Sequence, residues 1–408
     1  MTDNKKTPDI RFQGFTDAWE LRKFGELYEK VCEKNDLSYG TEKIISVANM
    51  YFKPDSRISD SEYLRTYNVF HLGDIAFEGN KSKNFAHGRF VENTIGNGIV
   101  SHVFDVFRPI MEYDLLFWKY VINNERIMGA VLIRSTKAST MMTNLVASDF
   151  LQEEILVPHV KEQKKIGVFF KRLDALITLH QRKCEKLKNI KKSMLEKMFP
   201  REGEKFPEIR FAGFTDAWEL RKLGEITKIL SASRVHKNEW KTEGVPFYRS
   251  SDVVSAFKGD KNDKVFISQE LYEKLITTSG RLEKGDILIT GGGSIGVPYI
   301  VPDDRALYSK DADLLWVKKS EKHESNFLYS YFICHRFRDY INSISHVGTI
   351  GHYTIEQVKD TPVALPTFGE QKEVGDFFIR LDALLTLHQR KCEKLKKVKS
   401  AMLERMFV

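Results

Sequence analysis

The chain has 408 residues, a formal net charge of +8 and a hydrophobic content of 42%, and this composition excludes a wholly disordered protein. No apolar run approaches the roughly 20 residues that a membrane-spanning helix requires. The polar N-terminus has no signal-peptide pattern, so we expect a cytoplasmic protein. The basic charge favours a polyanionic partner, although charge alone is a weak indicator.

The chain contains two pairs of repeated blocks. Residues 8–27 match residues 207–226 at 16 of 20 positions, and residues 162–199 match residues 370–407 at 28 of 38 positions. The stretches between the blocks share no comparable run. The repeats predict two equivalent halves of about 200 residues each, and a constant frame with differing contents is typical of a recognition protein.

These repeats predict an α+β fold. We expect two mixed α/β domains, separated by a pair of long antiparallel helices and related by a pseudo-twofold internal repeat. The predicted segments are a first variable domain at 1–155, a central helix with its linker at 156–206, a second variable domain at 207–364 and a C-terminal helix at 365–408.

The first variable domain offers two polar segments without acidic residues as candidate binding loops. One follows a predicted buried strand, and the other lies some way before the first long helix. Lysine and arginine suit phosphates and guanine edges, and asparagine suits adenine edges; ordinary exposed loops are the alternative. The candidate residues are Asn80, Lys81, Lys83, Asn84, His87 and Arg89 in the first segment and Arg134, Ser135, Thr136, Lys137 and Thr140 in the second.

The repeated segments 162–199 and 370–407 have apolar residues every three or four positions, which predicts one long packed helix in each. We expect their apolar stripes to pair in antiparallel orientation. A histidine lies on each stripe, where a polar residue could set the register. The residues predicted to pack are Ile166, Phe169, Leu173, Leu176, His180 and Leu187 in the first helix and Val374, Phe377, Leu381, Leu384, His388 and Leu395 in the second.

The second variable domain contains a glycine-rich turn at 291–296 that formally matches a dinucleotide-binding pattern. That interpretation requires a helix immediately afterwards, but a strand-like, proline-containing segment follows. We therefore favour a turn whose backbone amides approach a polyanion, or a purely structural turn. The candidate binding residues of this domain are Arg249 and Ser250 after a predicted strand, Gly292, Gly293 and Ser294 in the turn, and His346, Thr349, His352 and Tyr353 before the second long helix.

No catalytic signature is present. The sequence has no phosphate-binding loop of the G-x-x-x-x-G-K-[ST] type, no H-E-x-x-H and no G-x-S-x-G. No repeated acidic cluster suits metal-assisted cleavage of a phosphodiester. We predict neither catalytic residues nor a metal site in this chain, so any chemistry would come from another chain.

Two sets of motifs carry a family resemblance. The R-F-x-G-F-T-D-A-W blocks at Arg11–Trp19 and Arg210–Trp218, and the E-Q-K-x-[IV]-G-x-F-F-x-R-L-D helices beginning at Glu162 and Glu370, resemble the specificity subunit of type I restriction–modification enzymes. The resemblance covers the whole chain. It implies that the variable domains are target-recognition domains, that each recognises one half of a bipartite, asymmetric DNA site, and that the repeated helices form the spacer.

The resemblance also implies partners. It suggests double-stranded DNA, two modification (methyltransferase) subunits that use S-adenosylmethionine, and restriction (endonuclease and translocase) subunits that use ATP and Mg²⁺, acting together in host defence. No cofactor is expected on this chain. The helical pair would fix the gap between half-sites near one DNA turn, and the partner methyltransferases would extrude the target adenine.

Two other functions are compatible with the residues themselves. A protein–protein scaffold without sequence-specific DNA recognition would need only the long helices and a basic surface, and it would bind duplexes regardless of sequence. A self-contained nuclease would cleave DNA in the presence of a metal without any partner.

Overall fold

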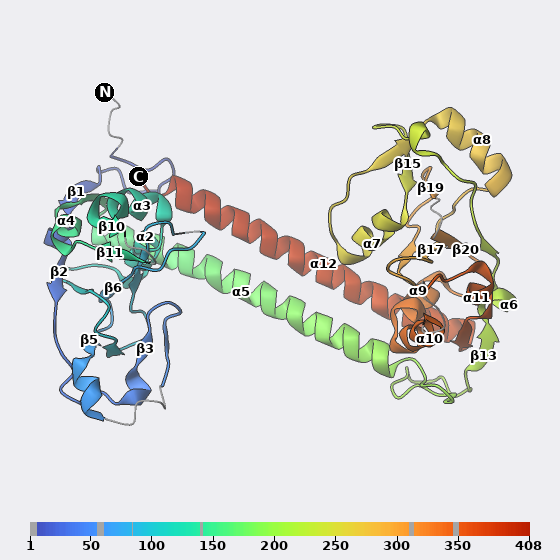
Figure 1. The fold of residues 1–408 in the computed structure, drawn as a ribbon, viewed down its shortest axis with the longest axis horizontal. Coiled ribbons are helices and arrows are strands. Elements are labelled where there is room, and N and C mark those ends of the chain that lie inside the picture. Colours follow the sequence, from blue (N-terminus) through green and yellow to red (C-terminus); the bar gives the residue numbers. More distant parts are fainter. Residues whose placement is uncertain (1–5, 55–60, 84, 139–141, 310–313, 346–350) are drawn as a thin grey trace. The chain divides into compact units, whose positions relative to one another are not determined.

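In the computed structural model, the chain forms two compact units. Unit 1 comprises residues 1–181 and 390–408, and unit 2 comprises residues 182–389. Each unit therefore contains one variable domain and a part of both long helices, α5 (Val160–Lys197) and α12 (Phe368–Arg405), which are green and red in Figure 1. The structure describes residues 6–54, 61–83, 85–138, 142–309, 314–345 and 351–408. No helix in these ranges combines the length and apolar character needed to cross a bilayer.

Unit 1 is built on a four-stranded antiparallel sheet with the strand order β2-β9-β6-β7. All four residues of β6 are buried, as expected for a central strand that is covered on both faces. The sheet strands are β2 (Tyr28–Val31), β6 (Ile75–Glu78), β7 (Arg89–Glu92) and β9 (Val106–Pro109). The smaller pairs are β1 (Glu20–Lys23) with β12 (Glu154–Val157), β3 (Ile45–Ser46) with β4 (Tyr51–Phe52), β5 (Asn68–Phe70) with β8 (Gly98–Val100) and β10 (Thr136–Ala138) with β11 (Thr143–Leu145). The helices are α1 (Phe24–Leu27), α2 (Leu115–Ile122), α3 (Glu125–Ser135), α4 (Ala147–Gln152) and the short η1 (Thr41–Lys43) and η2 (Ser61–Thr66).

Unit 2 repeats this design with a sheet in the order β14-β20-β17-β18. The chain follows the same path through both four-stranded sheets, so the internal repeat extends into the variable domains. The sheet strands are β14 (Ile229–Leu230), β17 (Ile287–Thr290), β18 (Pro298–Ile300) and β20 (Leu314–Val317). The other strands are β13 (Glu219–Lys222) with β21 (Pro362–Leu365), and β15 (Val245–Tyr248) between β16 (Val265–Ile267) and β19 (Tyr308–Ser309). The helices are α6 (Leu223–Ile226), α7 (Ser250–Lys258), α8 (Gln269–Ser279), α9 (Ser325–Ile333), α10 (His335–Ser345), α11 (Ile355–Asp360) and the short η3 (Lys237–Glu239).

The two long helices run antiparallel within each unit. In unit 1, Lys399 near the end of α12 forms an ion pair of 2.6 Å with Asp174 in the first half of α5. In unit 2, Lys191 near the end of α5 forms an ion pair of 2.6 Å with Asp382 in the first half of α12. The predicted α+β fold with paired antiparallel helices is thereby confirmed.

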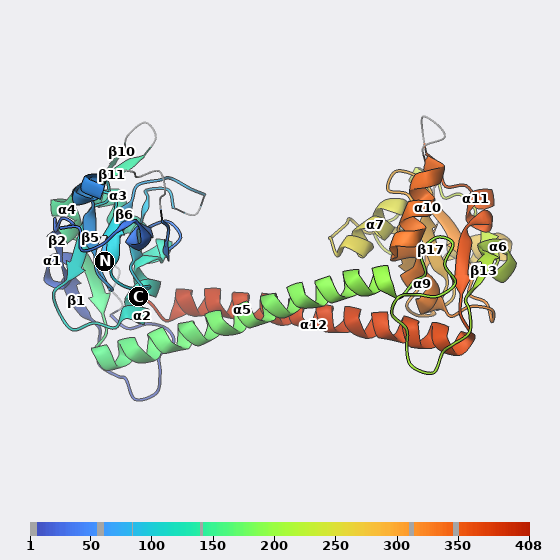
Figure 2. The ribbon, with the colours of Figure 1, turned by 90° about the horizontal axis from the view of Figure 1, so that it is seen from below.

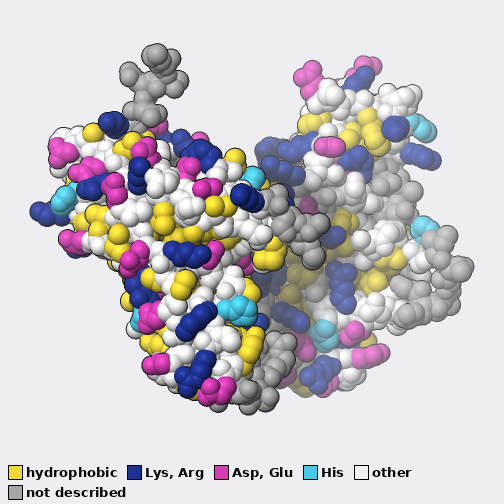
Figure 3. All heavy atoms as spheres, turned by 60° about the vertical axis from the view of Figure 1, so that its left-hand side comes forward, with side chains coloured by type: hydrophobic (Ala, Val, Ile, Leu, Met, Phe, Trp, Pro, Cys, Tyr) yellow, Lys and Arg dark blue, Asp and Glu magenta, His cyan; other side chains and the backbone are white. Residues whose placement is uncertain are grey.

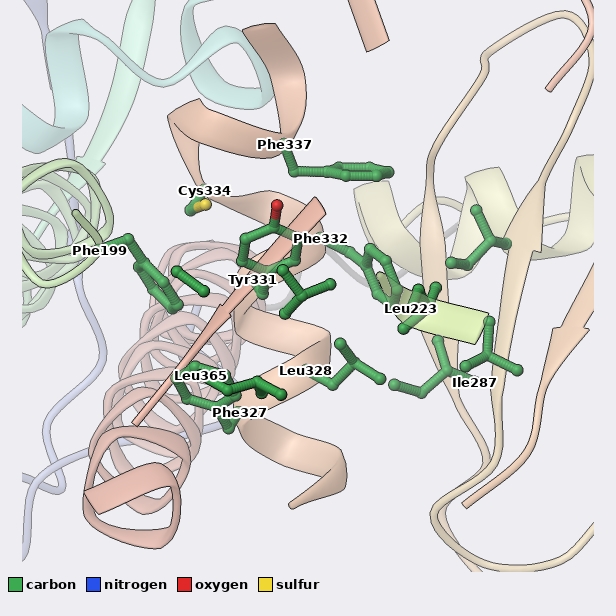
Figure 4. Packing of buried hydrophobic residues seen from close by; sticks show 14 of the residues in the cluster. Phe199, Leu223, Ile287, Phe327, Leu328, Tyr331, Phe332, Cys334, Phe337 and Leu365 are labelled. Atoms are coloured by element: carbon green, nitrogen blue, oxygen red, sulfur yellow. The ribbon is translucent and has the colours of Figure 1, made fainter. Parts of the chain in front are cut away.

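An aromatic residue at the end of each long helix enters the hydrophobic core of a variable domain. Phe407 packs edge-on against Trp19 with 6.4 Å between ring centroids, and Phe199 packs edge-on against Trp218 at 6.1 Å. Figure 4 shows Phe199 reaching from α5 into the cluster around Tyr331. The tryptophan in each repeated block is therefore the point where the end of a long helix joins the core.

The repeated arginine and glutamate form a buried ion pair in each unit. Arg11 donates two hydrogen bonds of 2.7 and 2.8 Å to Glu162, and Arg210 donates two of 2.6 and 2.7 Å to Glu370. The glutamate side chains are 1% and 0% exposed. These bidentate pairs fix the start of each long helix to its N-terminal block.

The next residues of the E-Q-K-x-[IV]-G motif join the same helix to the variable domain. The side chain of Gln163 accepts a 3.0 Å hydrogen bond from the backbone N–H of Asp114. A Cβ atom on Gly167 would lie only 2.6 Å from Asp114 Oδ1, so the glycine permits a close approach of α2 to α5. Gln371 and Gly375 make the same kinds of contact with the start of α9 in unit 2. The motif is explained by docking of the helix onto its domain.

The N-terminal segment docks on α12 as the central linker docks on α5. The backbone N–H of Ile10 donates to the carbonyl of Arg405 at 2.9 Å, and that of Ile209 donates to the carbonyl of Lys197 at 2.9 Å. The contact between Ile10 and Arg405 joins the N-terminal and C-terminal segments. The contact between Ile209 and Lys197 joins residues that are close in the sequence. In unit 1 the repeated N-terminal block is therefore held against the end of its long helix without a covalent connection.

The buried stripe of the long helices differs from the predicted one at two positions. The structure buries Ile166, Leu173, Val374 and Leu381, and it packs Phe169, Phe377, Leu187 and Leu395 partly buried against the cores. His180 and His388 are half-buried. Leu176 and Leu384, in contrast, are 44% and 45% exposed, because the neighbouring Ile177 and Leu385 occupy the stripe. Successive helical residues point about 100° apart, so only one of two adjacent apolar residues can face the partner helix.

Candidate nucleic-acid interface

The two loop segments predicted in unit 1 lie side by side. The first connects β6 to β7, and the second is the β10–β11 hairpin, which lies at one end of the unit in Figure 2. The backbone N–H of Thr143 donates to the carbonyl of Gly79 at 2.9 Å, and its hydroxyl donates to the carbonyl of His87 at 2.9 Å. A Cβ atom on Gly79 would lie 2.2 Å from the Thr143 carbonyl oxygen, so this junction requires glycine.

The equivalent segments of unit 2 are joined in the same way. The backbone N–H of Tyr353 donates to the carbonyl of Gly291 at 2.6 Å, at the start of the turn between β17 and β18. Within that turn the Thr290 hydroxyl accepts a 2.9 Å hydrogen bond from the backbone N–H of Val297. Gly293 has a positive φ of 64° and is exposed, and among the described residues no heavy atom lies within 4 Å of an added Cβ. Within the part of the chain that the structure describes, the turn is therefore uncovered at Gly293.

In both units, one edge of the domain is thus formed by two segments that are far apart in the sequence. We call these edges the loop edge of unit 1 (residues 79–83 and 85–88 with 136–138 and 142–145) and the loop edge of unit 2 (residues 291–297 with 351–354). Gly79 and Gly291 occupy the same place at the end of matching strands and accept the same kind of backbone hydrogen bond. The two loop edges therefore share the same backbone hydrogen bonding but carry different side chains.

Several predicted residues are exposed at the loop edge of unit 1. Asn80, Lys81 and Lys83 are exposed, and so is Lys137 on β10. Within the described residues, no carboxylate lies within ion-pair distance of Lys81 or Lys83. His87 is half-buried. The exposed lysines are available to phosphates.

An acidic side chain lies beneath the same edge. Burial raises the pKa of the Glu125 carboxylate, at the start of α3, and the nearby backbone N–H of Ala86 partly offsets this. The Oε2 atom is buried and has no hydrogen-bond partner in the part of the chain that the structure describes. Helix α3 therefore presents an acceptor to the loop of unit 1.

Four predicted residues of unit 1 have hydrogen-bond partners within their own domain. Arg89 donates to Glu78 at 2.8 Å, and Arg134 donates to Glu153 at 2.8 Å. The hydroxyls of Ser135 and Thr136 donate to backbone carbonyls one turn earlier in α3, at 2.8 and 2.6 Å. Ser135 is fully buried, so we do not retain it as a DNA contact. For Arg89, Arg134 and Thr136 a DNA contact stays a prediction, and Arg134 is 57% exposed.

Two predicted residues of unit 2 also have partners within their own domain. Tyr353 is 2% exposed, and its hydroxyl is bonded to the hydroxyl of Thr361. Arg249 donates to Asp252 at 2.8 Å and lies over the ring of Trp240. Their roles are in packing and in the start of α7, so we do not retain them as DNA contacts either.

The remaining predicted residues are distributed unevenly. Ser294 and His352 are exposed at the loop edge of unit 2 beside Gly293, whereas Gly292 is buried and Ser250 begins α7. Asn84, Thr140, His346 and Thr349 lie outside the described residues. Figure 3 shows basic side chains interspersed with acidic ones over the near face of unit 1, so charge alone does not mark the interface there.

Helix α10 carries two polar residues that belong to none of the segments predicted from the sequence. Arg338 and Asn342 are one helical turn apart, and Arg338 donates to the carbonyl of Ile295 in the turn of unit 2 at 3.4 Å. The search for loop motifs passed over them because both lie in a helix. A positively charged residue in a helix immediately before a predicted binding segment was the available signal.

Comparison with known proteins identifies the fold and the family. The crystal structure of the type I restriction–modification S subunit from M. genitalium has a TM-score of 0.53 at 15% identity, covering 98% of this chain and 99% of that one. A chain from a structural study of complex assembly and conformational transition in the type I R-M system has a TM-score of 0.51 at 17% identity, covering 95% and 97%. These likenesses show that the fold is that of S subunits.

The model of the type I restriction modification DNA specificity domain matches residues 17–189 and 215–397. The chain therefore belongs to this family and contains its domain twice. The type I restriction enzyme MjaVIII specificity subunit of Methanocaldococcus jannaschii is 24% identical over 286 residues, which are 66% of this chain and 65% of that protein. The putative MjaX specificity subunit of the same organism is 22% identical over 344 residues, 82% and 74% of the two chains. This confirms the predicted resemblance.

Proposed function

We propose that this chain is the DNA sequence-recognition subunit of a type I restriction–modification complex, with each unit recognising one half of a bipartite, asymmetric site. The observation that supports this most directly is the pair of loop edges. Both have the same backbone frame, joined at Gly79 and Gly291, but they carry different polar side chains. Equivalent frames with different contents are what two half-sites of unlike sequence require.

Mapping of methylated adenines tests this function. The chain would be expressed with its modification subunits, and N6-methyladenine would be mapped in the host DNA with and without this gene. We expect one bipartite motif that depends on the gene. Replacing residues 28–155 with the corresponding segment of another specificity subunit should change one half of the motif and leave the other unchanged. A change in both halves, or methylation without a motif, would contradict independent recognition by the two units.

We further propose that two modification subunits bind the chain, one on each unit. Leu176 and Leu179 in α5 are 44% and 45% exposed, and their equivalents Leu384 and Leu387 in α12 are 45% and 44% exposed. Exposed leucines at matching positions of an internal repeat fit two copies of the same partner. The complex would act in the cytoplasm.

The chemistry would then lie in the partner chains. S-adenosylmethionine would bind to the modification subunits, and ATP and Mg²⁺ would bind to the restriction subunits. This chain would contribute no catalytic residue and would position the others on DNA.

The long helices would set the distance between the half-sites. Each is continuous over 38 residues, and the start and end of each are fixed to a variable domain by the contacts of the repeated blocks. Inserting one heptad after Leu176 and one after Leu384 adds about two turns to both helices. The unread gap in the methylated motif should then lengthen while both half-sites persist; an unchanged gap would exclude this role.

A further inference from the structure

We infer that α10 presents Arg338 and Asn342 to base edges of the half-site that unit 2 recognises, with Arg338 placed on a guanine. This inference rests on the proposed function and names the residues that give unit 2 its specificity. The starting observation is that α10 packs directly against the glycine turn of the loop edge. A Cβ atom on Gly296 would lie 3.0 Å from the ring of Phe337 and 3.3 Å from Ile341. Figure 4 shows Phe337 above the same core.

Arg338 follows Phe337 and lies beside the turn. Its Nη1 atom donates to the carbonyl of Ile295 at 3.4 Å, a long contact for a hydrogen bond. The side chain is half-buried, and burial lowers the pKa of its guanidinium. One end of the guanidinium fork is thus held against the backbone of the loop edge.

The absence of a carboxylate distinguishes Arg338 from other arginines in similar surroundings. Arg11, Arg89 and Arg108 in unit 1, and Arg210 in unit 2, each pair with a carboxylate at 3.1 Å or less. Among the described residues, no carboxylate lies within 4 Å of Arg338. A partly desolvated guanidinium without a neighbouring anion is unfavourable unless another acceptor takes its hydrogen bonds. Donors on Arg338 therefore remain without a carboxylate acceptor among the described residues, and we infer that a base edge supplies the acceptor.

Asn342 supplies the second observation. It lies four residues after Arg338, so both side chains are on one face of α10, and Asn342 is exposed. Arginine recognises the O6 and N7 atoms of guanine as a bidentate donor, and asparagine recognises the N6 and N7 atoms of adenine. A neutral asparagine adds no general attraction to phosphates, so the pair fits base edges better than backbone.

The test uses the full complex of this chain with its modification subunits. The methylated motif would be mapped for the wild type, Arg338→Ala, Arg338→Lys, Asn342→Ala and the control Arg336→Ala. Arg336 is on the same helix but donates to Pro200 O at the end of α5. Binding of each complex to the mapped duplex, and to duplexes with single base changes, would be measured over a range of salt concentrations.

We expect Arg338→Ala to weaken binding of the cognate duplex by about 10- to 100-fold and to relax the motif at one guanine of a single half-site. Arg338→Lys should not restore specificity for that guanine, because lysine lacks the planar, bidentate guanidinium group. Asn342→Ala should relax an adjacent adenine, and Arg336→Ala should leave motif and affinity unchanged. Persistence of the other positions in the same half-site shows that unit 2 of the variants is folded.

Two results would overturn the inference. One is an unchanged motif in the Arg338 variants. The other is a loss of affinity that is the same for all sequences and is restored in Arg338→Lys. In that case the slope of log affinity against log salt concentration would fall by about one in Arg338→Ala, which is the signature of a phosphate contact. If the wild type itself produces no motif, the proposed function fails, which is a different outcome from either of these.

Discussion

The buried ion pair between Arg11 and Glu162 provides a quantitative test of how the repeated blocks hold each unit together. Arg11→Met would leave the Glu162 carboxylate, which is 1% exposed, without its two hydrogen bonds of 2.7 and 2.8 Å. Removing one partner of a buried ion pair destabilises a protein by about 3–5 kcal/mol. Arg11 retains 15% exposure, so water can partly replace it, and we expect a loss of about 3 kcal/mol.

Three further variants distinguish the loss of this ion pair from unspecific destabilisation. Arg11→Met with Glu162→Met should cost less than the sum of the single changes, by about 2 kcal/mol, because no uncompensated charge remains. Arg22→Met should change stability by less than about 0.5 kcal/mol, since its ion pair with Glu20 is exposed. Arg210→Met should have the same effect in unit 2 as Arg11→Met has in unit 1.

Hydrogen exchange of backbone amides suits a chain with two units, because it reports the stability of each segment separately. Arg11→Met should accelerate exchange at the start of α5 and leave the start of α12 unchanged. Exchange indistinguishable from the wild type at the start of α5, or a double variant as unstable as the sum of the two single variants, would refute the assignment of Arg11 and Glu162 as a stabilising pair.

Three further outcomes are expected. Burial raises the pKa of Glu92 well above its usual value, so stability due to its protonated form is present below about pH 4 and is lost as the pH rises toward the folded-state pKa. The urea midpoint of Glu92→Gln relative to the wild type should therefore rise between about pH 4 and pH 7, and a constant difference would contradict this. A circular permutant that joins Val408 to Lys6 through a short linker and opens the chain between α5 and β13 should fold and produce the same methylated motif, because the docking bonds are equal at 2.9 Å; an insoluble permutant would count against it. Glutamates at Leu176 and Leu179 should reduce the modification subunits bound per chain from two to one by native mass spectrometry, and two bound subunits would exclude this docking site.

Much of the frame was predictable because its determinants are local or repeated. The period of apolar residues predicted both long helices, and the matching blocks predicted equivalent halves. The exposure of Leu176 was not predictable, because Leu176 and Ile177 are both apolar and fit the helical period about equally well. Only the position of the partner helix selects one of them for burial.

The candidate interface was predictable in part. Composition singled out both loop segments of each unit, and the structure places the members of each pair together. It also shows that Tyr353 is buried against Thr361, a partner that no local motif distinguishes. Whether a polar side chain is free for a ligand depends on which distant groups surround it.

The sequence by itself determined that the protein has two equivalent frames, two long helices and variable contents, because repetition and periodicity are properties of the chain alone. The tertiary structure alone decided which polar groups remain available at each loop edge, and it brought Arg338 to the glycine turn. The physical reason is that hydrogen bonding and burial of a side chain are set by contacts between segments distant in sequence, such as Gly79 with Thr143 and Gly291 with Tyr353.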